Sequence, residues 1–189
     1  MKKQILVVGA GGHSKVVTEI VNMSSEWEIV AYLDEQPKAD LFLGKPVFTS
    51  LESLKFHFPA VRFAFVAIGQ NNIRKLWHES LEKNDYNLPW LKHPTAEVSA
   101  SAQIGSGTLI AAKSFVGPDA KVGRGVIVNT AAILDHDSSI GDFSHLSQGA
   151  IACGGAQISA EVLIGPGCIL EKMAVASATT PANDVVTAQ

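Results

Sequence analysis

The sequence predicts an α/β domain built on a parallel sheet, followed by a solenoid of hexapeptide repeats. Up to about residue 93, short apolar segments alternate with segments of helical periodicity, which is typical of parallel strands joined by helices. Beyond that point an aliphatic residue or alanine occupies every sixth position. A period of six fits neither an amphipathic helix nor a two-faced sheet, and it indicates a coil with three flat faces.

The N-terminal elements are expected in alternating order. We expect strands at residues 5–8, 29–33, 63–68 and 88–91, a helix through Val16, Val17, Ile20 and Val21, and further helices at residues 51–58 and 71–84. His93 precedes Pro94, and the residue before a proline is restricted to extended backbone. We therefore place the domain boundary here, which gives domains at 1–93 and 94–189.

Two sets of positions define the solenoid. The inward set is expected to stack on its equivalent 18 residues later, and its members are Val98, Ile104, Ile110, Val116, Val122, Val128, Leu134, Ile140, Leu146, Ala152, Ile158, Ile164 and Leu170. Small or modest side chains follow four residues after each: Ala102, Thr108, Ser114, Ala120, Val126, Ala132, Ser138, Ser144, Ala150, Ala156, Val162, Cys168 and Ala174. Three hexads would complete one coil.

The composition limits the classes of function. Hydrophobic residues make up 47% of the chain and charged residues 17%, which suits a well-buried protein with subunit contacts. A net charge of −3 gives no support for nucleic-acid binding, and no apolar run is long enough for membrane insertion. We expect Cys153 and Cys168 to be free thiols and the location to be cytoplasmic. The solenoid has only His136 and His145 where a zinc site would need three histidines, so we expect no metal.

A glycine-rich segment, residues 9–14, lies between the first strand and the first helix. Glycines there let a phosphate approach the backbone, and the helix N-terminus supplies amide donors. Asp34, at the end of the next strand, is placed to accept a hydrogen bond from a ribose hydroxyl. Ser14 stands where the dinucleotide fingerprint has glycine, and the domain is short for NAD, so we favour a mononucleotide-type ligand. The alternative is a tight turn with no ligand.

The solenoid carries one cluster of reactive polar residues. His136 is expected at a corner, pointing outward, and histidine is the side chain best suited to act as a base near neutral pH. Asp137 could fix its tautomer and raise its basicity. His145 follows nine residues later, half a coil away. The alternative is that all three are ordinary surface residues.

Four segments together resemble the family of sialic acid O-acetyltransferases and bacterial nucleotide-amino-sugar N-acetyltransferases: VVGAGGHSKVV, YLDE, FVAIGQNNIRK and VNTAAILDHDSSIGDFSHLSQGAIACGG. The resemblance implies a Rossmann-like domain that holds a nucleotide sugar, and a left-handed parallel β-helix that binds acetyl-CoA. It also implies a homotrimer with active sites between adjacent β-helices. The residues after Leu170 differ from the family's usual C-terminal pattern.

The resemblance also assigns roles to individual residues. It implies that His136 is the general base and that Asp137 supports it. For acetyl-CoA it implies His145 at the thioester and Gly165 and Pro166 along the pantetheine. The positions expected to cradle the nucleotide sugar are Gly11, Gly12, His13, Asp34, Glu35 and Gly69.

We therefore expect an enzyme that moves an acetyl group from acetyl-CoA to the amino group of a nucleotide-linked amino sugar, for surface glycan or polysaccharide biosynthesis. Acetyl-CoA would act as a co-substrate, and no permanently bound cofactor is expected. Two alternatives remain. One is O-acetylation of a sugar of the sialic acid type, and the other is a non-catalytic trimeric scaffold that binds nucleotide sugars.

Overall fold

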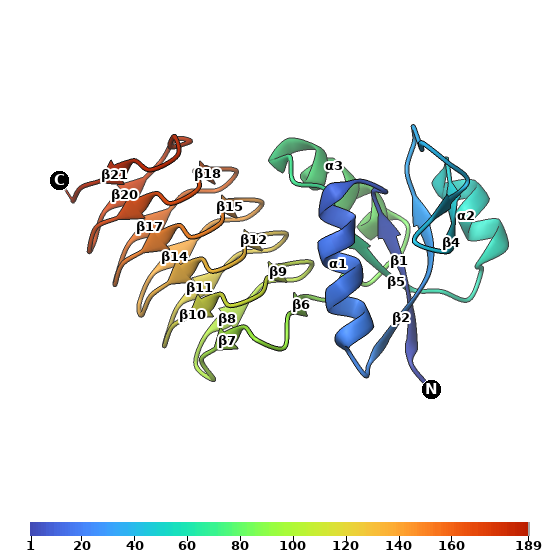
Figure 1. The fold of residues 1–189 in the computed structure, drawn as a ribbon, viewed down its shortest axis with the longest axis horizontal. Coiled ribbons are helices and arrows are strands. Elements are labelled where there is room, and N and C mark those ends of the chain that lie inside the picture. The colour runs from blue at the N-terminus through green and yellow to red at the C-terminus, as the bar shows by residue number, and fades with distance from the viewer. Residues whose placement is uncertain (189) are drawn as a thin grey trace. The chain divides into compact units, whose positions relative to one another are not determined.

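The computed structural model describes residues 1–188, which form two compact units divided between Pro89 and Trp90. The predicted fold class is confirmed, because a parallel α/β sheet is followed by a left-handed β-helix of short strands (Figure 1). The division lies four residues before the boundary that we predicted at His93. No helix in the described part of the chain is long and apolar enough to cross a membrane.

The first unit contains a five-stranded sheet in the order β3-β4-β2-β1-β5. Its elements are β1 (Lys3–Val8), α1 (Gly12–Met23), β2 (Trp27–Leu33), β3 (Leu41–Phe42), β4 (Lys45–Phe48), α2 (Leu51–His57), β5 (Phe63–Val66) and α3 (Asn71–Lys83). All strand pairs except β3–β4 are parallel. Since β2 and β5 lie on opposite sides of β1, the strand order reverses at β1. Open α/β sheets bind ligands at the carboxyl ends of strands at such a point.

Two details of this unit differ from the sequence prediction. The β3–β4 hairpin was not predicted, because its two-residue turn is Leu43-Gly44 rather than an Asn-Gly or Asp-Gly signal; both residues have positive φ, 48° and 77°. The strand predicted at 88–91 is wrong. Asn87 forms only an isolated bridge with Phe63, whereas β6 (Leu91–Lys92) pairs with a solenoid strand. The hexad register thus extends one repeat further toward the N-terminus.

The second unit is a three-sided stack of two-residue strands. They are β6 (Leu91–Lys92), β7 (Glu97–Val98), β8 (Gln103–Ile104), β9 (Leu109–Ile110), β10 (Phe115–Val116), β11 (Lys121–Val122), β12 (Ile127–Val128), β13 (Ile133–Leu134), β14 (Ser139–Ile140), β15 (His145–Leu146), β16 (Ile151–Ala152), β17 (Gln157–Ile158), β18 (Leu163–Ile164), β19 (Ile169–Leu170), β20 (Val175–Ala176) and β21 (Val185–Val186). The three parallel sheets have the orders β21-β19-β16-β13-β10-β7, β20-β17-β14-β11-β8 and β18-β15-β12-β9-β6.

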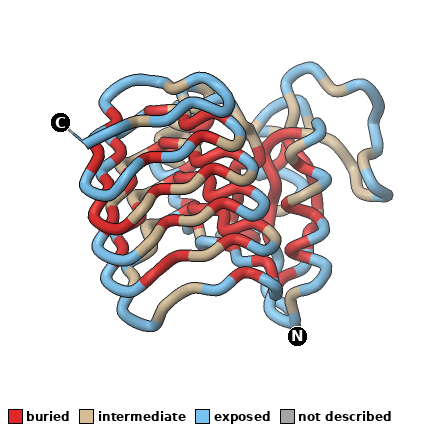
Figure 2. Tube along the Cα trace, turned by 60° about the vertical axis from the view of Figure 1, so that its left-hand side comes forward, coloured by how far each residue is buried: buried red, intermediate tan, exposed pale blue. Residues whose placement is uncertain are grey.

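The predicted inward positions are confirmed. From β7 to β19, each strand ends on the predicted aliphatic residue or alanine, and these residues form one core with the small set (Figure 2). Only the members nearest the N-terminus, Val98, Ala102 and Ile104, are partly exposed. The core therefore continues along the whole stack, as expected for a solenoid.

Two inward hydroxyls link successive coils. Thr108 donates to the Gly123 carbonyl at 2.8 Å and accepts from the Val126 amide at 3.1 Å. Ser144 donates to the Ser159 carbonyl at 2.7 Å and accepts from the Val162 amide at 3.0 Å. Positions 108, 126, 144 and 162 follow one another at intervals of 18 residues and form one column of the stack. Along this column hydroxyl residues at 108 and 144 alternate with valines at 126 and 162. Each hydroxyl is buried, and its hydrogen bonds offset the cost of its burial.

The last coil is shorter than the others. Ile158 pairs with Ala176, 18 residues later, but Leu170 pairs with Val186, 16 residues later. The stack nevertheless continues past Leu170, the last inward aliphatic position that the regular repeat predicted.

Candidate functional site

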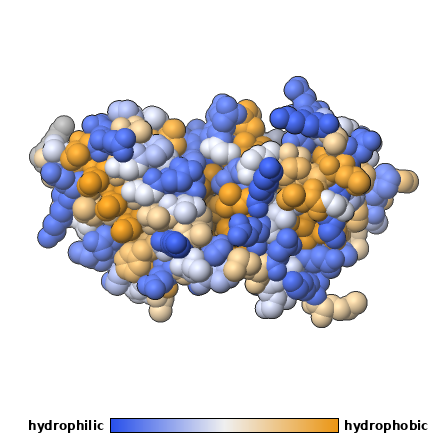
Figure 3. Space-filling view, viewed as in Figure 1, coloured by the Kyte–Doolittle hydropathy of each residue, from blue (hydrophilic) through white to orange (hydrophobic). Residues whose placement is uncertain are grey.

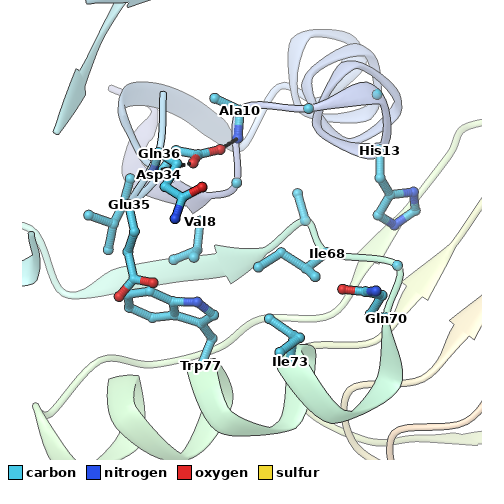
Figure 4. A pocket seen from close by; sticks show the side chains of 16 residues that line it. Val8, Ala10, His13, Asp34, Glu35, Gln36, Ile68, Gln70, Ile73 and Trp77 are labelled. Atoms are coloured by element: carbon cyan, nitrogen blue, oxygen red, sulfur yellow. Dashed lines mark hydrogen bonds between the residues drawn. The ribbon is translucent and has the colours of Figure 1, made fainter. Parts of the chain in front are cut away.

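A pocket of about 830 Å³ opens in the first unit at the carboxyl ends of β1, β2 and β5 (Figure 4). It contains all six positions that we expected to hold a nucleotide sugar. Its lining residues are Val8, Gly9, Ala10, Gly11, Gly12, His13, Leu33, Asp34, Glu35, Gln36, Ala67, Ile68, Gly69, Gln70, Ile73 and Trp77. The pocket thus lies where the strand order reverses, the preferred ligand position in this kind of sheet.

The glycine-rich loop is shaped by Gly9 and Ser14. Gly9 has φ of 103°, and a Cβ there would lie 3.0 Å from the Ala67 carbonyl oxygen, so the loop requires glycine. The buried Ser14 hydroxyl donates to the Gly9 carbonyl at 2.8 Å and accepts from the Gly11 amide at 3.3 Å. Ser14 therefore holds the turn closed, which explains the departure from the dinucleotide fingerprint. Around Gly11, Gly12 and Gly69 the space beside the backbone is open to a ligand.

Asp34 and Glu35 occupy different environments. The Asp34 carboxylate accepts from the Ala10 amide at 2.9 Å and from the Gln36 amide at 3.0 Å. It therefore joins the glycine-rich loop to the end of β2, a role that we did not anticipate when assigning it to a ribose hydroxyl. Glu35 is exposed, and its side chain extends into the pocket toward Trp77 (Figure 4).

His13 lies at the end of the pocket opposite Glu35 (Figure 4), where it is influenced by the charge of the buried Arg74. Burial, followed by the positive charge of Arg74, lowers the pKa of His13 to about 4, so the imidazole is neutral at pH 7. Its Nε2 atom is buried without a hydrogen-bond partner. Arg74 is 1% exposed and donates to the carbonyls of Ile68 and Gly69 at 3.1 and 2.9 Å. Arg74 thereby fixes the loop after β5, and His13 offers an unused polar atom to a ligand.

Several pocket residues were missed by the sequence analysis. Gln70 is the N-cap residue of α3, and Ile73 and Trp77 lie in its first two turns, where they share one face at a spacing of four residues. Trp77 also packs against the hydrophobic core of the first unit. The spacing was visible in the sequence, but nothing local indicated that this helix face lines a pocket.

In the solenoid, His136 and Asp137 form a hydrogen-bonded pair. The His136 Nδ1 atom lies 2.7 Å from Asp137 Oδ2, and both side chains are more than half exposed. The hydrogen bond to Asp137, supported by the charge of Asp135, raises the pKa of His136. With Nδ1 engaged by a carboxylate, Nε2 is the nitrogen left to exchange a proton with a substrate.

Gly154 lies directly against the His136 ring. A Cβ at position 154 would lie 2.5 Å from Nε2 and 2.7 Å from Cε1. Position 154 is one coil above position 136, and the Gly155 amide donates to the His136 carbonyl at 2.9 Å. The imidazole therefore occupies the space that a side chain at 154 would fill.

His145 is held separately from His136. Its Nε2 atom lies 2.9 Å from Asn129 Nδ2, and Asn129 is 6% exposed. The Asn129 Oδ1 atom accepts from the Thr130 amide at 2.8 Å, so the orientation of the Asn129 side chain is fixed. His145 projects from β15, half a coil from the corner that carries His136. Asn129 was not among our predicted site residues.

Gly165 and Pro166 lie at a corner covered by the last coil. A Cβ on Gly165 would come within 2.4 Å of the Pro181 backbone, so close packing of the coils requires glycine here. The Pro166 carbonyl accepts from the Asn183 amide at 2.8 Å, and its side chain is exposed. Their predicted role in binding acetyl-CoA stays a prediction.

The chain matches known proteins over most of its length. Residues 4–81 match the PglD N-terminal domain family. A segment of 115 residues is 36% identical to the UDP-N-acetylbacillosamine N-acetyltransferase of Bacillus subtilis, covering 58% of this chain and 52% of that protein. The alignment thus spans about half the length of this curated relative.

Two solved structures match almost the whole chain. The acetyltransferase domain of PglB from Neisseria gonorrhoeae in complex with acetyl coenzyme A is 34% identical, with a TM-score of 0.89 over 99% of this chain and 94% of that chain. A mutant of perosamine N-acetyltransferase from Caulobacter crescentus in complex with CoA and GDP-perosamine is 27% identical, with a TM-score of 0.77 over 97% and 93%. These relatives give no support to the sialic acid O-acetyltransferase part of the resemblance.

Proposed function

The chain belongs to the nucleotide-amino-sugar N-acetyltransferase family, and on that premise we propose that it transfers the acetyl group of acetyl-CoA to the amino group of a nucleotide-linked amino sugar. Such products serve the synthesis of surface glycans. The observation that carries the proposal is the His136–Asp137 pair, whose 2.7 Å hydrogen bond orients an exposed imidazole beside Gly154.

In the proposed reaction the amine attacks the thioester carbonyl of acetyl-CoA directly. His136 Nε2 takes the proton that the amine loses, and the Asp137 carboxylate stabilises the resulting imidazolium. CoA then leaves as the thiol. Base catalysis of this kind contributes roughly 10²- to 10⁴-fold to the rate, and holding both substrates together supplies a further part. Cys168 is buried in the core, and direct attack by the amine requires no covalent intermediate on a cysteine.

The pocket of the first unit is the proposed site for the nucleotide sugar. Amide donors at the start of α1 and open space beside Gly11, Gly12 and Gly69 suit a diphosphate. The buried, unpaired Nε2 of His13 offers a hydrogen bond that only a ligand would satisfy. His145, Gly165 and Pro166 are the proposed acetyl-CoA contacts, with Asn129 orienting His145.

We further propose a homotrimer with the active site shared between copies. His136 and His145 project from the solenoid half a coil apart, so both can reach one acetyl group only if they come from different chains. The outward positions of one sheet form an apolar row, which matches the row of hydrophobic side chains on the solenoid in Figure 3; its members are Phe115, Ile133, Ile151, Ile169 and Val185. Ile169 and Val185 are 39% and 52% exposed in the single chain, and a second copy would cover them.

The two free thiols support the proposed cytoplasmic location.

The test is a screen of nucleotide amino sugars with acetyl-CoA, read by thiol release and by the mass of the product. We expect the nucleotide amino sugar to gain one acetyl group on its amine, and we expect the His136→Ala variant to lose turnover. Product acetylated on a hydroxyl would replace the amine acceptor with an alcohol. Binding of nucleotide sugars without any thiol release from acetyl-CoA would favour the scaffold alternative.

A further inference from the structure

The turn that carries His136 has an equivalent in each of the next two coils. His136 lies between β13 and β14, Gly154 between β16 and β17, and Lys172 between β19 and β20, at intervals of 18 residues. Backbone hydrogen bonds fix this register, because the Gly155 amide donates to the His136 carbonyl at 2.9 Å and the Met173 amide donates to the Gly154 carbonyl at 3.1 Å. His136, Gly154 and Lys172 therefore form one column on the outside of the solenoid.

Gly154 leaves the space between His136 and Lys172 open. The His136 ring leans toward Gly154, since a Cβ at position 154 would lie 2.5 Å from Nε2. Neighbouring coils of parallel strands are about 4.8 Å apart, and a lysine has a long flexible stem. The Lys172 side chain can therefore reach back across position 154 toward His136 Nε2.

The charge of Lys172 already acts on His136. The hydrogen bond from Asp137 and the charge of Asp135 raise the pKa of His136, and the positive charge of Lys172 opposes them. Lys172 is exposed, and within residues 1–188 no hydrogen bond or ion pair holds its ammonium group. The other titratable side chains of these turns are carboxylates or a thiol: Asp119 one coil below His136, Cys153 one coil above it, and Glu171 beside Lys172.

We propose that the Lys172 ammonium group stabilises the negative charge that develops on the acetyl thioester during transfer, an inference that rests on the proposed function. The amine nitrogen uses its lone pair to form a bond to the thioester carbon, and His136 Nε2 takes the amine proton. The carbonyl oxygen gains negative charge. The C–S bond then breaks with its electron pair on sulfur, and the imidazolium returns the proton to that sulfur.

The position of the reacting carbon follows from the position of His136 Nε2. The amine must lie within hydrogen-bond reach of Nε2 while it bonds to this carbon. Because Nε2 leans toward Gly154, the thioester lies over Gly154 and on the side of Lys172. A cation held there interacts more strongly with the charged transition state than with the neutral thioester, and this difference is what accelerates the reaction.

The test compares kcat of wild type and Lys172→Met as a function of pH, by thiol release at saturating acetyl-CoA and nucleotide amino sugar. At pH values above both midpoints His136 is neutral in both proteins, so the plateau reports on the transition state alone. The plateau kcat of Lys172→Met should fall roughly 10-fold, as expected for loss of one partly solvated charge near the reacting atoms. KM for both substrates should stay within about 2-fold, because the ground-state thioester is neutral.

The midpoint of the same profile reports whether Lys172 and His136 are close. Without the lysine charge the imidazolium is less disfavoured, so the pKa of His136 should rise and the midpoint should move to higher pH. NMR titration of His136 should show the same shift. Lys172→Arg keeps the charge and should keep both the plateau and the midpoint near wild type. Lys121→Met is the matched control, since Lys121 is an exposed lysine on β11, in another sheet of the solenoid.

An unchanged plateau kcat in Lys172→Met would overturn the inference while leaving the proposed reaction intact. Equal losses in Lys172→Arg and Lys172→Met would also overturn it, because the charge would then be irrelevant. A raised KM for acetyl-CoA with unchanged kcat would assign Lys172 to donor binding instead. Absence of acetyl transfer in the wild type, to any nucleotide amino sugar, would overturn the proposed reaction itself and this role with it.

Discussion

Replacing Gly154 with alanine should disable the proposed base without unfolding the solenoid. Gly154 has negative φ, so alanine suits its backbone. The new Cβ would lie 2.5 Å from His136 Nε2, and comfortable contact needs roughly 3.5 Å. The ring must therefore move by about 1 Å. It can do so, because it is the end of an exposed side chain rather than part of the core.

We expect Gly154→Ala to lower kcat. A displacement of about 1 Å in a catalytic group can reduce the rate by roughly 10²-fold, and the same movement weakens the hydrogen bond to Asp137. Thiol release from acetyl-CoA under saturating conditions measures kcat, and NMR titration of His136 should show a lower pKa than in the wild type. The melting temperature should change little, because the core of the coil is untouched.

The double variant His136→Ala/Gly154→Ala decides whether the effect passes through the imidazole. If it does, adding Gly154→Ala to His136→Ala should cost nothing further. Wild-type kcat in Gly154→Ala would refute the steric argument. Additive losses in the double variant would show that Gly154 acts independently of His136.

Further outcomes follow from the same geometry. His136→Ala should lower kcat by roughly 10²-fold or more in a folded protein, with little effect on substrate affinity; full retention of kcat would place the base elsewhere. The neutral imidazole is the active form and its pKa is raised, so the rate should rise with pH through a midpoint above 6.5. Asp137→Asn removes the main cause of that rise, so its midpoint should move to lower pH while its plateau rate falls. Gly11→Val should weaken the nucleotide sugar at least about 10-fold in calorimetry and spare acetyl-CoA, since the backbone is extended (φ −111°) and the space is open; equal losses would indicate a purely structural loop. Val128→Asp buries a charge at a fully buried position at a cost of several kcal/mol, and should unfold or aggregate the protein in thermal melts.

The solenoid could be predicted because its signal is repetitive. Each inward residue is supported by equivalents six and 18 residues away, so one atypical position such as Ala152 does not obscure the pattern. The 16-residue last coil was missed for the same reason, since a register shift appears only once. The glycine-rich loop was also predictable, because its glycines stand between a strand and a helix.

The remaining features depend on contacts between distant residues. Asp34 binds the Ala10 amide 24 residues away, and Asn129 reaches His145 across 16 residues. Nor does the local sequence indicate that the His136 ring lies against the Gly154 backbone of the next coil, or that Trp77 borders a pocket. Those contacts follow from the packing of whole elements, which no single motif encodes.

The alternating hydroxyl column of the solenoid bears on how the coils find their correct partners during folding. Near-identical hexads allow a coil to pair with the wrong neighbour, one full coil out of place, while keeping its aliphatic residues inside. Such an error would set Ser144 directly on Thr108, or Val162 directly on Val126. In the second case the Val162 amide would lose the Ser144 hydroxyl that accepts its hydrogen bond and would be buried without an acceptor, at a cost of about 1–3 kcal/mol. Thr108 and Ser144 thus make alternate coils chemically different from one another. A stack that is slipped by one coil would therefore be less stable than the native stack.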